Sequence, residues 1–530
     1  MIQLDITDLM NESLTQDKSG TVSQRKRWGL RLGAITFGLL VVAGLELTCR
    51  AFGWGIPSQQ DDPYVGFSEV TALFAQNGDF YEVAPARLKF FAAESFPVRK
   101  PDDQFRTFVL GGSTVQGRPY SIETTFGTWL QLGLEADNTD RSWDVVNCGG
   151  LSYASYRLVS ILEECLTYQP DLIVVCTGHN EFLEDRSYDH LKPDSQAERL
   201  TMNLSAKSHL FHLFRSMVST TETKNAASTK PELNGEVDAI LDYNDSLKAY
   251  HRDDEWRAKI VEHFEFNLGR MIDLCQQAKV PIIMIRPPAN LGDSPPFKSE
   301  LSEFLSDEDT QNVRRLMDTA RENYRDNLSK SISSLEEAVE LDPRFALAWY
   351  ELGQCYLTRK RHEDAKQAFR KARDEDICPL RIVSELEQAM IEISKKENIP
   401  LIDAFQILEQ QSRSGILDSQ WLADHVHPTV PGHQAIATEL QNQMSHMGLC
   451  VFNSESDKRQ QAWKHHHDSL DDYYFLKGRE TLNSLRGWAA GRADGPPAAE
   501  RFPKRVVTPK SPTAKEFEPS DTTNPLQSSK

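Results

Sequence analysis

Segments far apart in the chain carry side chains that could together perform nucleophilic catalysis. Ser113 follows an apolar run at 105–110 through Gly111 and Gly112. Small residues after a strand let the chain turn sharply and present a side chain at the edge of a sheet. Ser113 is therefore a candidate nucleophile, although Gly-Gly-Ser turns are common and the signal alone is modest. The turn lacks the Gly-Lys-Ser/Thr of a phosphate-binding loop.

A second segment, at 424–428, supplies a base and a group to orient it. An Asp three residues before a His, as in Asp424 and His427, can bond one ring nitrogen. The other nitrogen is then free to accept a proton from a serine. His425 and His433 lie nearby and raise the question of a metal site. Their spacing differs from H-E-x-x-H, so we expect no metal and interpret both as polar neighbours.

Two further segments could stabilise negative charge on a reacting carbonyl oxygen. Asn180 follows the apolar run 172–177, and its amide could donate to an oxyanion. Turn formation is the alternative role of an Asn at such a place. Another strand-like run ends at Asn147, just before Gly149 and Gly150.

Alternating strand-like and helix-like segments must position these residues. The predicted strands cover 105–110, 143–146, 172–177, 281–286 and 400–402. The predicted helices between them cover 125–134, 156–168 and 255–277. Strands that alternate with helices predict a mostly parallel sheet covered on both faces. Ligands of such sheets bind at the carboxyl ends of the strands, where the candidate residues lie.

Taken together, these segments resemble the SGNH/GDSL hydrolase family, over roughly 100–300 and 380–445. The family's four blocks are a Ser after the first strand, a Gly after an Asn-ended second strand, a Gly-x-Asn and a C-terminal Asp-x-x-His. They fall on Ser113, the turn 147–152, Asn180, and Asp424 with His427. The resemblance implies an α/β fold with a flavodoxin-like three-layer parallel sheet, and no cofactor.

The resemblance also implies a reaction at an ester carbonyl. Ser113 would attack the carbonyl, His427 would take its proton and later protonate the leaving alcohol, and Asp424 would orient the ring. Asn180 and the backbone N–H groups of Ser113 and the second block would hold the oxyanion.

Two positions depart from the family pattern. The second-block Gly often stands five residues after the Asn, where this chain has Ser152, so that Gly149 or Ser152 could be the backbone donor. The family's Gly-x-Asn-Asp reads Gly-His-Asn-Glu here, which puts the carboxyl of Glu181 one carbon further out.

An insertion between the fourth and fifth strands carries a repeat pattern. Seven positions match the tetratricopeptide signature: Trp349, Leu352, Gly353, Tyr356, Ala365, Phe369 and Ala372. Ser331, Leu335 and Ala338 match the second half of that pattern 34 residues earlier. About one and a half repeats are fewer than a free solenoid needs, so we expect them to pack on the catalytic core. They could also bind a protein partner.

Residues 28–48 are apolar enough to cross a membrane as one helix. Basic residues at 25–27 precede this stretch and only Arg50 closely follows it. The positive-inside rule therefore places residues 1–27 in the cytoplasm and the catalytic part outside, anchored in the cell membrane. A cleaved signal peptide and a lipid-modified Cys49 both fit poorly with Glu46. A buried core helix is the remaining alternative.

Composition limits the classes of function. The formal charge of −19, from 59 basic and 78 acidic residues, argues against a nucleic-acid binder. The eight cysteines are scattered, with no CxxC pair, and we expect small buried side chains. A disulfide or two stays open for an exported domain.

The predicted organisation has eight segments. These are a cytoplasmic tail (1–27), a transmembrane helix (28–48), a linker leading into the first strand (49–100), the hydrolase domain in two parts (101–300 and 381–450), the helical insertion with the repeat (301–380), a helical extension (451–485) and a disordered tail (486–530). The polar stretch 183–250 is interpreted as a lid. The arrangement resembles membrane-anchored bacterial members of the SGNH/GDSL family that carry a repeat insertion.

Three functions are compatible with this sequence. The first is a serine esterase that acts on small acyl esters, including O-acetyl groups of a glycan. The second is an O-acyltransferase, which would form the same acyl-enzyme. The third is a non-catalytic scaffold that binds a partner through the repeat.

Overall fold

The computed structural model describes residues 24–52, 54, 62–191, 208–218, 231–242 and 246–492. The chain separates into two compact units, Met1–Asp62 with Leu191–Thr229, and Pro63–His190 with Lys230–Lys530. Most of the predicted cytoplasmic tail, parts of the predicted lid and the tail from 493 onward lie outside the described residues.

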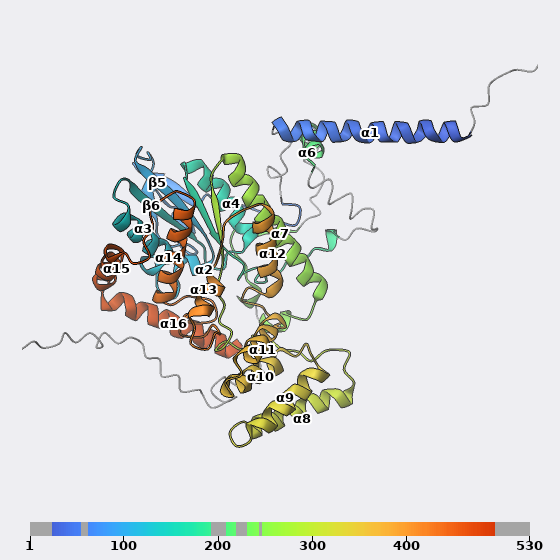
Figure 1. Cartoon of the computed structure of the whole chain (residues 1–530), viewed down its shortest axis with the longest axis vertical. Helices are drawn as coiled ribbons and strands as arrows, with labels where there is room; N and C mark the ends of the chain where they lie inside the picture. Colours follow the sequence, from blue (N-terminus) through green and yellow to red (C-terminus); the bar gives the residue numbers. More distant parts are fainter. Residues whose placement is uncertain are drawn as a thin grey trace, which may run out of the picture. The chain divides into compact units, whose positions relative to one another are not determined.

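A five-stranded parallel sheet forms the centre of the larger unit (Figure 1). Its strands are β5 (Gln104–Gly111), β6 (Ser142–Gly149), β7 (Leu172–Cys176), β9 (Ile282–Arg286) and β10 (Leu401–Asp403). They lie in the order β10-β9-β7-β5-β6 with every neighbouring pair parallel. This is the flavodoxin-like order 2-1-3-4-5. The predicted fold class and all five predicted strands are confirmed.

Helices cover both faces of the sheet (Figure 1). One layer contains α3 (Phe126–Asp137), α14 (Val430–His446) and α15 (Asp457–Ser469). The other contains α4 (Ser155–Cys165), α7 (Asp254–Ala278) and α12 (Ser384–Lys396). The strands are buried along nearly their whole length, which explains why they read as continuous apolar runs rather than as alternating ones.

The segment 49–100 is more structured than the predicted linker. It contains an antiparallel sheet of β2 (Phe74–Asn77), β3 (Phe80–Val83) and β4 (Ser95–Pro97). Phe96 is buried and its ring lies 5.3 Å from that of Phe108 on β5. These strands are only three or four residues long, too short to give a clear local signal. Aromatic contacts with the main sheet contribute to their stability.

The insertion folds into two helical hairpins. They consist of α8 (Asp307–Asn323) with α9 (Leu328–Leu341), and α10 (Ala346–Thr358) with α11 (His362–Asp374). The sequence did not reveal α8 as the first helix of the earlier repeat. Its buried face consists of only Val313, Leu316, Met317 and Ala320 in an otherwise charged segment.

The C-terminal extension continues beyond its predicted end. After α15, helix α16 (Asp472–Arg492) includes residues 486–492, which the sequence assigned to a disordered tail. Arg486 donates hydrogen bonds to the carbonyl of Ala423, with Nη2 at 2.8 Å. This contact attaches the last turns of the helix to the segment just before Asp424.

The smaller unit contains α1 (Gln24–Phe52) and α6 (His209–Val218). Within α1, residues Leu32–Phe52 have the length and composition of a membrane span, as a signal sequence near the N-terminus also would. Glu46 accepts hydrogen bonds from the Ser208 hydroxyl and from the first N–H groups of α6. This part of the predicted lid therefore packs on α1.

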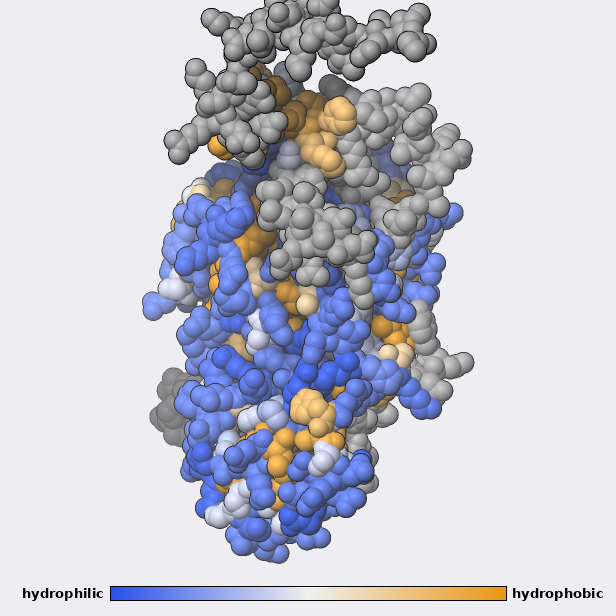
Figure 2. All heavy atoms as spheres, turned by 90° about the vertical axis from the view of Figure 1, so that its right-hand side faces the viewer, coloured by the Kyte–Doolittle hydropathy of each residue, from blue (hydrophilic) through white to orange (hydrophobic). Residues whose placement is uncertain are grey.

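Surface and cysteines agree with the composition. Hydrophilic side chains cover most of the coloured part of the face in Figure 2, with apolar ones in smaller patches.

All eight cysteines are free thiols, and all but Cys450 are buried. The prediction of small buried side chains is confirmed.

Candidate active site

Ser113 lies where β5 ends and the short helix α2 (Ser113–Gln116) begins. Gly112 caps this helix, and a Cβ atom at Gly112 would lie 2.4 Å from the amide nitrogen of Asn180. Only glycine permits this approach of the first and third sequence blocks. The Ser113 side chain is 9% exposed, so a reacting acyl group would be largely shielded from solvent.

His427 connects Ser113 to Asp424 in one line of hydrogen bonds. The Nε2 atom of His427 lies 2.8 Å from Oγ of Ser113, although the residues are 314 positions apart. Nδ1 lies 2.7 Å from Oδ2 of Asp424. The structure thus brings together the nucleophile, base and orienting carboxylate that the sequence predicted.

Asp424 is held as an ionised carboxylate. Burial acts to raise its pKa, but attraction to His427 and His425 and hydrogen bonds from His427 outweigh burial and hold the pKa well below its usual range. Its second oxygen accepts the backbone N–H groups of Val426 and His427, each at 2.9 Å. A fixed anion at Nδ1 favours the tautomer in which Nε2 can accept the Ser113 proton.

The structure separates the two candidate backbone donors. The N–H of Gly149 donates to Oδ1 of Asn147 at 2.9 Å, and a Cβ at Gly149 would lie 2.1 Å from the Gln116 nitrogen. Gly149 thus allows β6 to pack against α2, and its N–H is already used. Ser152 has φ +64° and its N–H makes no hydrogen bond within the described residues. Ser152 is therefore the better candidate, in a left-handed conformation that favours the family's Gly.

Comparisons with known proteins bear on the fold and on the insertion. The sequence matches none of the curated proteins compared. Residues 324–379 match the tetratricopeptide repeat family, as predicted. Similar solved structures include an alpha/beta hydrolase enzyme from the Lake Arreo metagenome (13% identity, TM-score 0.29, covering 66% of this chain and 97% of that one). A lipase/acylhydrolase from Enterococcus faecalis (12%, 0.29, 65% and 97%) and an acetylxylan esterase from Geobacillus stearothermophilus (14%, 0.27, 66% and 97%) are also similar.

The strand order decides the fold, with Ser113 after the first strand and Asn180 after the third. The chain has a flavodoxin-like three-layer α/β fold, as the resemblance to SGNH hydrolases implied.

The turn after β7 positions Asn180 beside Gly112, next to Ser113. The Nδ2 atom of Asn180 donates to the carbonyl of Tyr153 at 3.0 Å, which fixes the amide with its nitrogen close to Gly112. The other amide hydrogen is then available for a ligand. This geometry suits an oxyanion donor.

Replacing Asn180 by alanine should lower kcat for a short ester about 100- to 1000-fold, with a smaller change in KM. The physical reason is the loss of one donor to the charged intermediate. Steady-state kinetics measure the effect. A loss below about threefold would show that Asn180 only forms a turn.

Replacing Ser152 by glycine should leave kcat within about threefold of wild type. The backbone N–H stays in place, and glycine adopts the left-handed conformation without strain. The same assay measures this. A drop as large as that of Asn180→Ala would mean that the Ser152 hydroxyl itself takes part.

Glu181 explains the departure from Gly-x-Asn-Asp. Its fully buried carboxylate accepts the backbone N–H of Ser155 at 2.8 Å and the Ser155 hydroxyl at 2.9 Å, where α4 begins. Burial raises the pKa of Glu181. The longer side chain thus attaches the turn that carries Asn180 to the start of α4. A negative charge is favourable at the N-terminus of a helix.

The other two histidines near His427 in the sequence, His425 and His433, are largely buried, and burial favours their neutral form. Burial lowers the pKa of His425 to about 4 and that of His433 to about 3. His433 accepts the Phe126 N–H at Nδ1, at 3.2 Å. Within the described residues no group of three or more His, Cys, Asp or Glu side chains could hold a metal.

A pH-dependent stability should follow from His433. Its pKa of about 3 in the fold lies below the ordinary 6.5, so the unfolded chain binds a proton that the folded chain does not. Stability from this group is fully present above pH 6.5 and decreases as pH falls toward 3, by about 1.4 kcal/mol per pH unit. In urea titrations between pH 6 and 4, His433→Asn should lessen the slope by that amount. Exposed His465→Asn is the matched control, and equal slopes for wild type and His433→Asn would contradict the assignment.

Asn290 is a residue near the site that the sequence did not reveal. Its backbone N–H donates to the carbonyl of His425 and its Nδ2 to the carbonyl of Asp424, both at 3.0 Å. Asn290 follows β9 as Asn180 follows β7, and Asn147 lies within β6 near its carboxyl end. An Asn shortly after a parallel strand was the signal that could have identified it.

Proposed function

We propose that this chain is a serine ester hydrolase of the SGNH type that acts through an acyl-enzyme on small acyl esters. The observation that carries the proposal is the alignment of Ser113, His427 and Asp424, with contacts of 2.8 and 2.7 Å. A serine hydroxyl needs such a base to become nucleophilic near neutral pH.

The residues divide the reaction into two steps. Ser113 Oγ attacks the ester carbonyl while His427 Nε2 takes its proton, and Asn180 with the Ser152 N–H stabilises the oxyanion. His427 then protonates the leaving alcohol, which departs and leaves an acyl-Ser113. Water, deprotonated by His427, attacks the acyl carbon and releases the acid and Ser113.

The burial of the reacting groups supports a small acyl group. Ser113 is 9% and His427 4% exposed, so an acyl group must enter a site that is shielded from solvent, and we infer that this group is small. Acetyl groups fit this restriction, and we propose O-acetyl groups of a glycan as substrate. With α1 as membrane anchor, the catalytic unit would face an extracytoplasmic glycan.

Acyl transfer to a sugar hydroxyl is the second candidate. The same burial restricts access of water to an acyl-Ser113, and exclusion of water favours an alcohol acceptor. The first step would be unchanged, with the acceptor hydroxyl replacing water in the second.

The test is release of p-nitrophenol from p-nitrophenyl acetate by the full chain in detergent, with and without an oligosaccharide acceptor. Hydrolysis predicts acetate as the product at all acceptor concentrations, whereas transfer predicts acetylated oligosaccharide. A wild type no faster than Ser113→Ala would reject both and favour a scaffold that binds a partner through the repeat.

A further inference from the structure

The repeat helices bind a loop of the catalytic unit. The loop follows β9 and covers residues 287–298. On α10, the Tyr350 hydroxyl and the Gln354 amide both donate to the carbonyl of Gly292, at 3.1 and 2.6 Å. One surface of α10 is therefore occupied by the chain's own backbone.

This loop in turn holds the segment that contains the base. Through Asn290 it donates to the carbonyls of Asp424 and His425. Two more backbone hydrogen bonds, from Leu291 and Gly292, go to the carbonyl of Leu417. The position of Asp424 relative to Ser113 thus depends on where the loop lies.

Arg381, which follows the repeat, binds the backbone of the same loop. Its guanidinium is 2% exposed and Nη1 donates to the carbonyls of Asn290 and Ser294, each at 2.7 Å. Nη2 lies 3.7 Å from the carboxylate of Asp376. Asp376 also accepts the N–H groups of Phe297 and Lys298, so one buried ion pair holds both ends of the loop.

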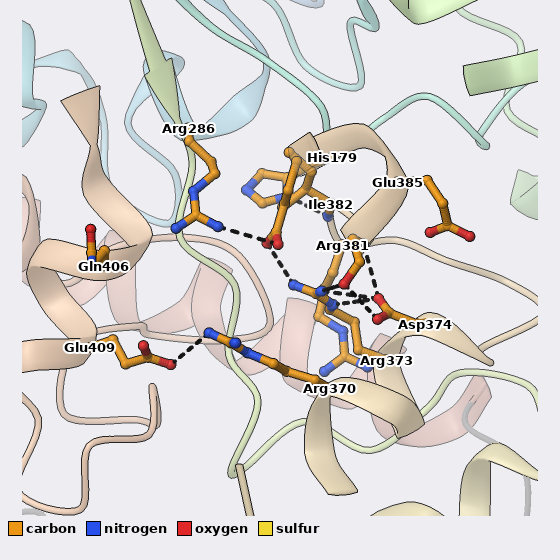
Figure 3. A network of polar contacts seen from close by, with 12 residues as sticks. His179, Arg286, Arg370, Arg373, Asp374, Arg381, Ile382, Glu385, Gln406 and Glu409 are labelled. Atoms are coloured by element: carbon orange, nitrogen blue, oxygen red, sulfur yellow. Dashed lines mark hydrogen bonds and ion pairs between the residues drawn. The ribbon is translucent and has the colours of Figure 1, made fainter. Parts of the chain in front are cut away.

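Ile382, the residue after Arg381, contacts the segment that carries the candidate oxyanion donor Asn180. The backbone N–H of Ile382 donates to Nδ1 of His179 at 3.0 Å, and His179 is the neighbour of Asn180. Figure 3 shows His179, Arg381 and Ile382 within one polar network with Arg373 of α11. Arg381 thus contacts the loop that binds the Asp424 segment, and Ile382 contacts the residue next to Asn180.

Ion pairs attach this network to the sheet. Arg373 on α11 and Arg286 at the end of β9 both bind Glu387 of α12, at 2.7 and 3.2 Å. Arg286 also binds Asp403 at the end of β10. Because these side chains are largely buried, the repeat is fixed against the carboxyl ends of the strands, where the site lies.

We propose that Arg381 is a positioning residue for the acid–base pair, through which the tetratricopeptide segment holds Asp424 and His427 in reach of Ser113. The inference rests on the proposed function and adds a role for the insertion in it. The repeat binds a loop of its own chain. Loss of these contacts would displace His427 without removing any reacting group. A displacement of about 1 Å can cost about 100-fold in rate.

The test compares Arg381→Met with Arg381→Lys in the full chain, with p-nitrophenyl acetate as substrate. Methionine keeps much of the volume but removes the donors, and should lower kcat about 10- to 100-fold with KM within threefold. Lysine restores one donor and should recover part of the loss. A purely structural role predicts an unchanged kcat per folded molecule, with the folded fraction determined by circular dichroism.

Two further variants keep the inference falsifiable. The double variant Tyr350→Phe, Gln354→Leu removes both hydrogen bonds to the carbonyl of Gly292 and should lower kcat about 3- to 10-fold. This variant tests the inference if Arg381→Met does not fold. Exposed Arg359→Met, on the same repeat and hydrogen-bonded to Ser329, should retain wild-type kcat. Folded variants with wild-type kcat would overturn the inference alone, whereas an inert wild type would overturn the proposed function and the inference with it.

Discussion

Replacing Ser113 by alanine lowers kcat for p-nitrophenyl acetate by about 10⁴- to 10⁶-fold. Alanine removes the only atom that can form the acyl-enzyme, and what remains is the smaller contribution of binding and of the oxyanion donors. Because the Ser113 side chain is small and lies in a preformed turn, the variant should fold like the wild type. Steady-state kinetics on purified full chain, with circular dichroism as a check of folding, measure the effect.

The matched control is Ser333→Ala. Ser333 is exposed on α9 and its hydroxyl donates to the carbonyl of Lys330 in its own helix, so its loss should leave kcat unchanged. A Ser113→Ala variant that keeps a tenth or more of the wild-type rate would show that another group attacks the ester.

Replacing Asp424 by asparagine should lower kcat by about 10⁴-fold. The amide has nearly the shape of the carboxylate, but it is neutral and its NH2 group can face Nδ1 of His427. That contact would favour the tautomer with a hydrogen on Nε2, which cannot accept the Ser113 proton. The low pKa of the ionised Asp424, which results from His427 and His425 despite burial, would have no counterpart in the variant.

Kinetics of Asp424→Asn at pH 6 to 9 measure this effect, with Asp140→Asn as the control. Asp140 is 70% exposed, so its variant should behave like wild type. A loss of less than tenfold in Asp424→Asn would mean that the carboxylate orients His427 only weakly and that backbone contacts suffice.

Much of the hydrolase fold could be predicted because its signals are local. Strands β7 and β9 contain apolar runs of four or more residues, β5 and β6 contain mostly apolar stretches, and β10 is a short fifth strand of three residues. Each candidate residue follows such a stretch or lies in a short motif. Order along the chain then determined which segments would meet at the carboxyl ends of the strands. Ser113, Asn180, Asp424 and His427 were identified in this way.

The features that were missed depend on contacts between distant segments. Strands β2 to β4 are held by aromatic packing of Phe96 on Phe108, and the last turns of α16 by the bond of Arg486 to Ala423. Asn290 binds backbone carbonyl groups, which every residue has, so the sequence gives no sign of its partners. Likewise, only the backbone showed that the N–H of Gly149 is used while that of Ser152 is available.

The central claim is that Ser113 is a nucleophile activated by His427, and covalent labelling tests it most directly. The full chain would be treated with a fluorophosphonate, digested, and its labelled peptide identified by mass spectrometry, for wild type and for His427→Ala. We predict one adduct, on Ser113, that forms readily in the wild type and about 10⁴-fold more slowly in the variant. No adduct, an adduct on another serine, or equal labelling of both proteins would contradict the account.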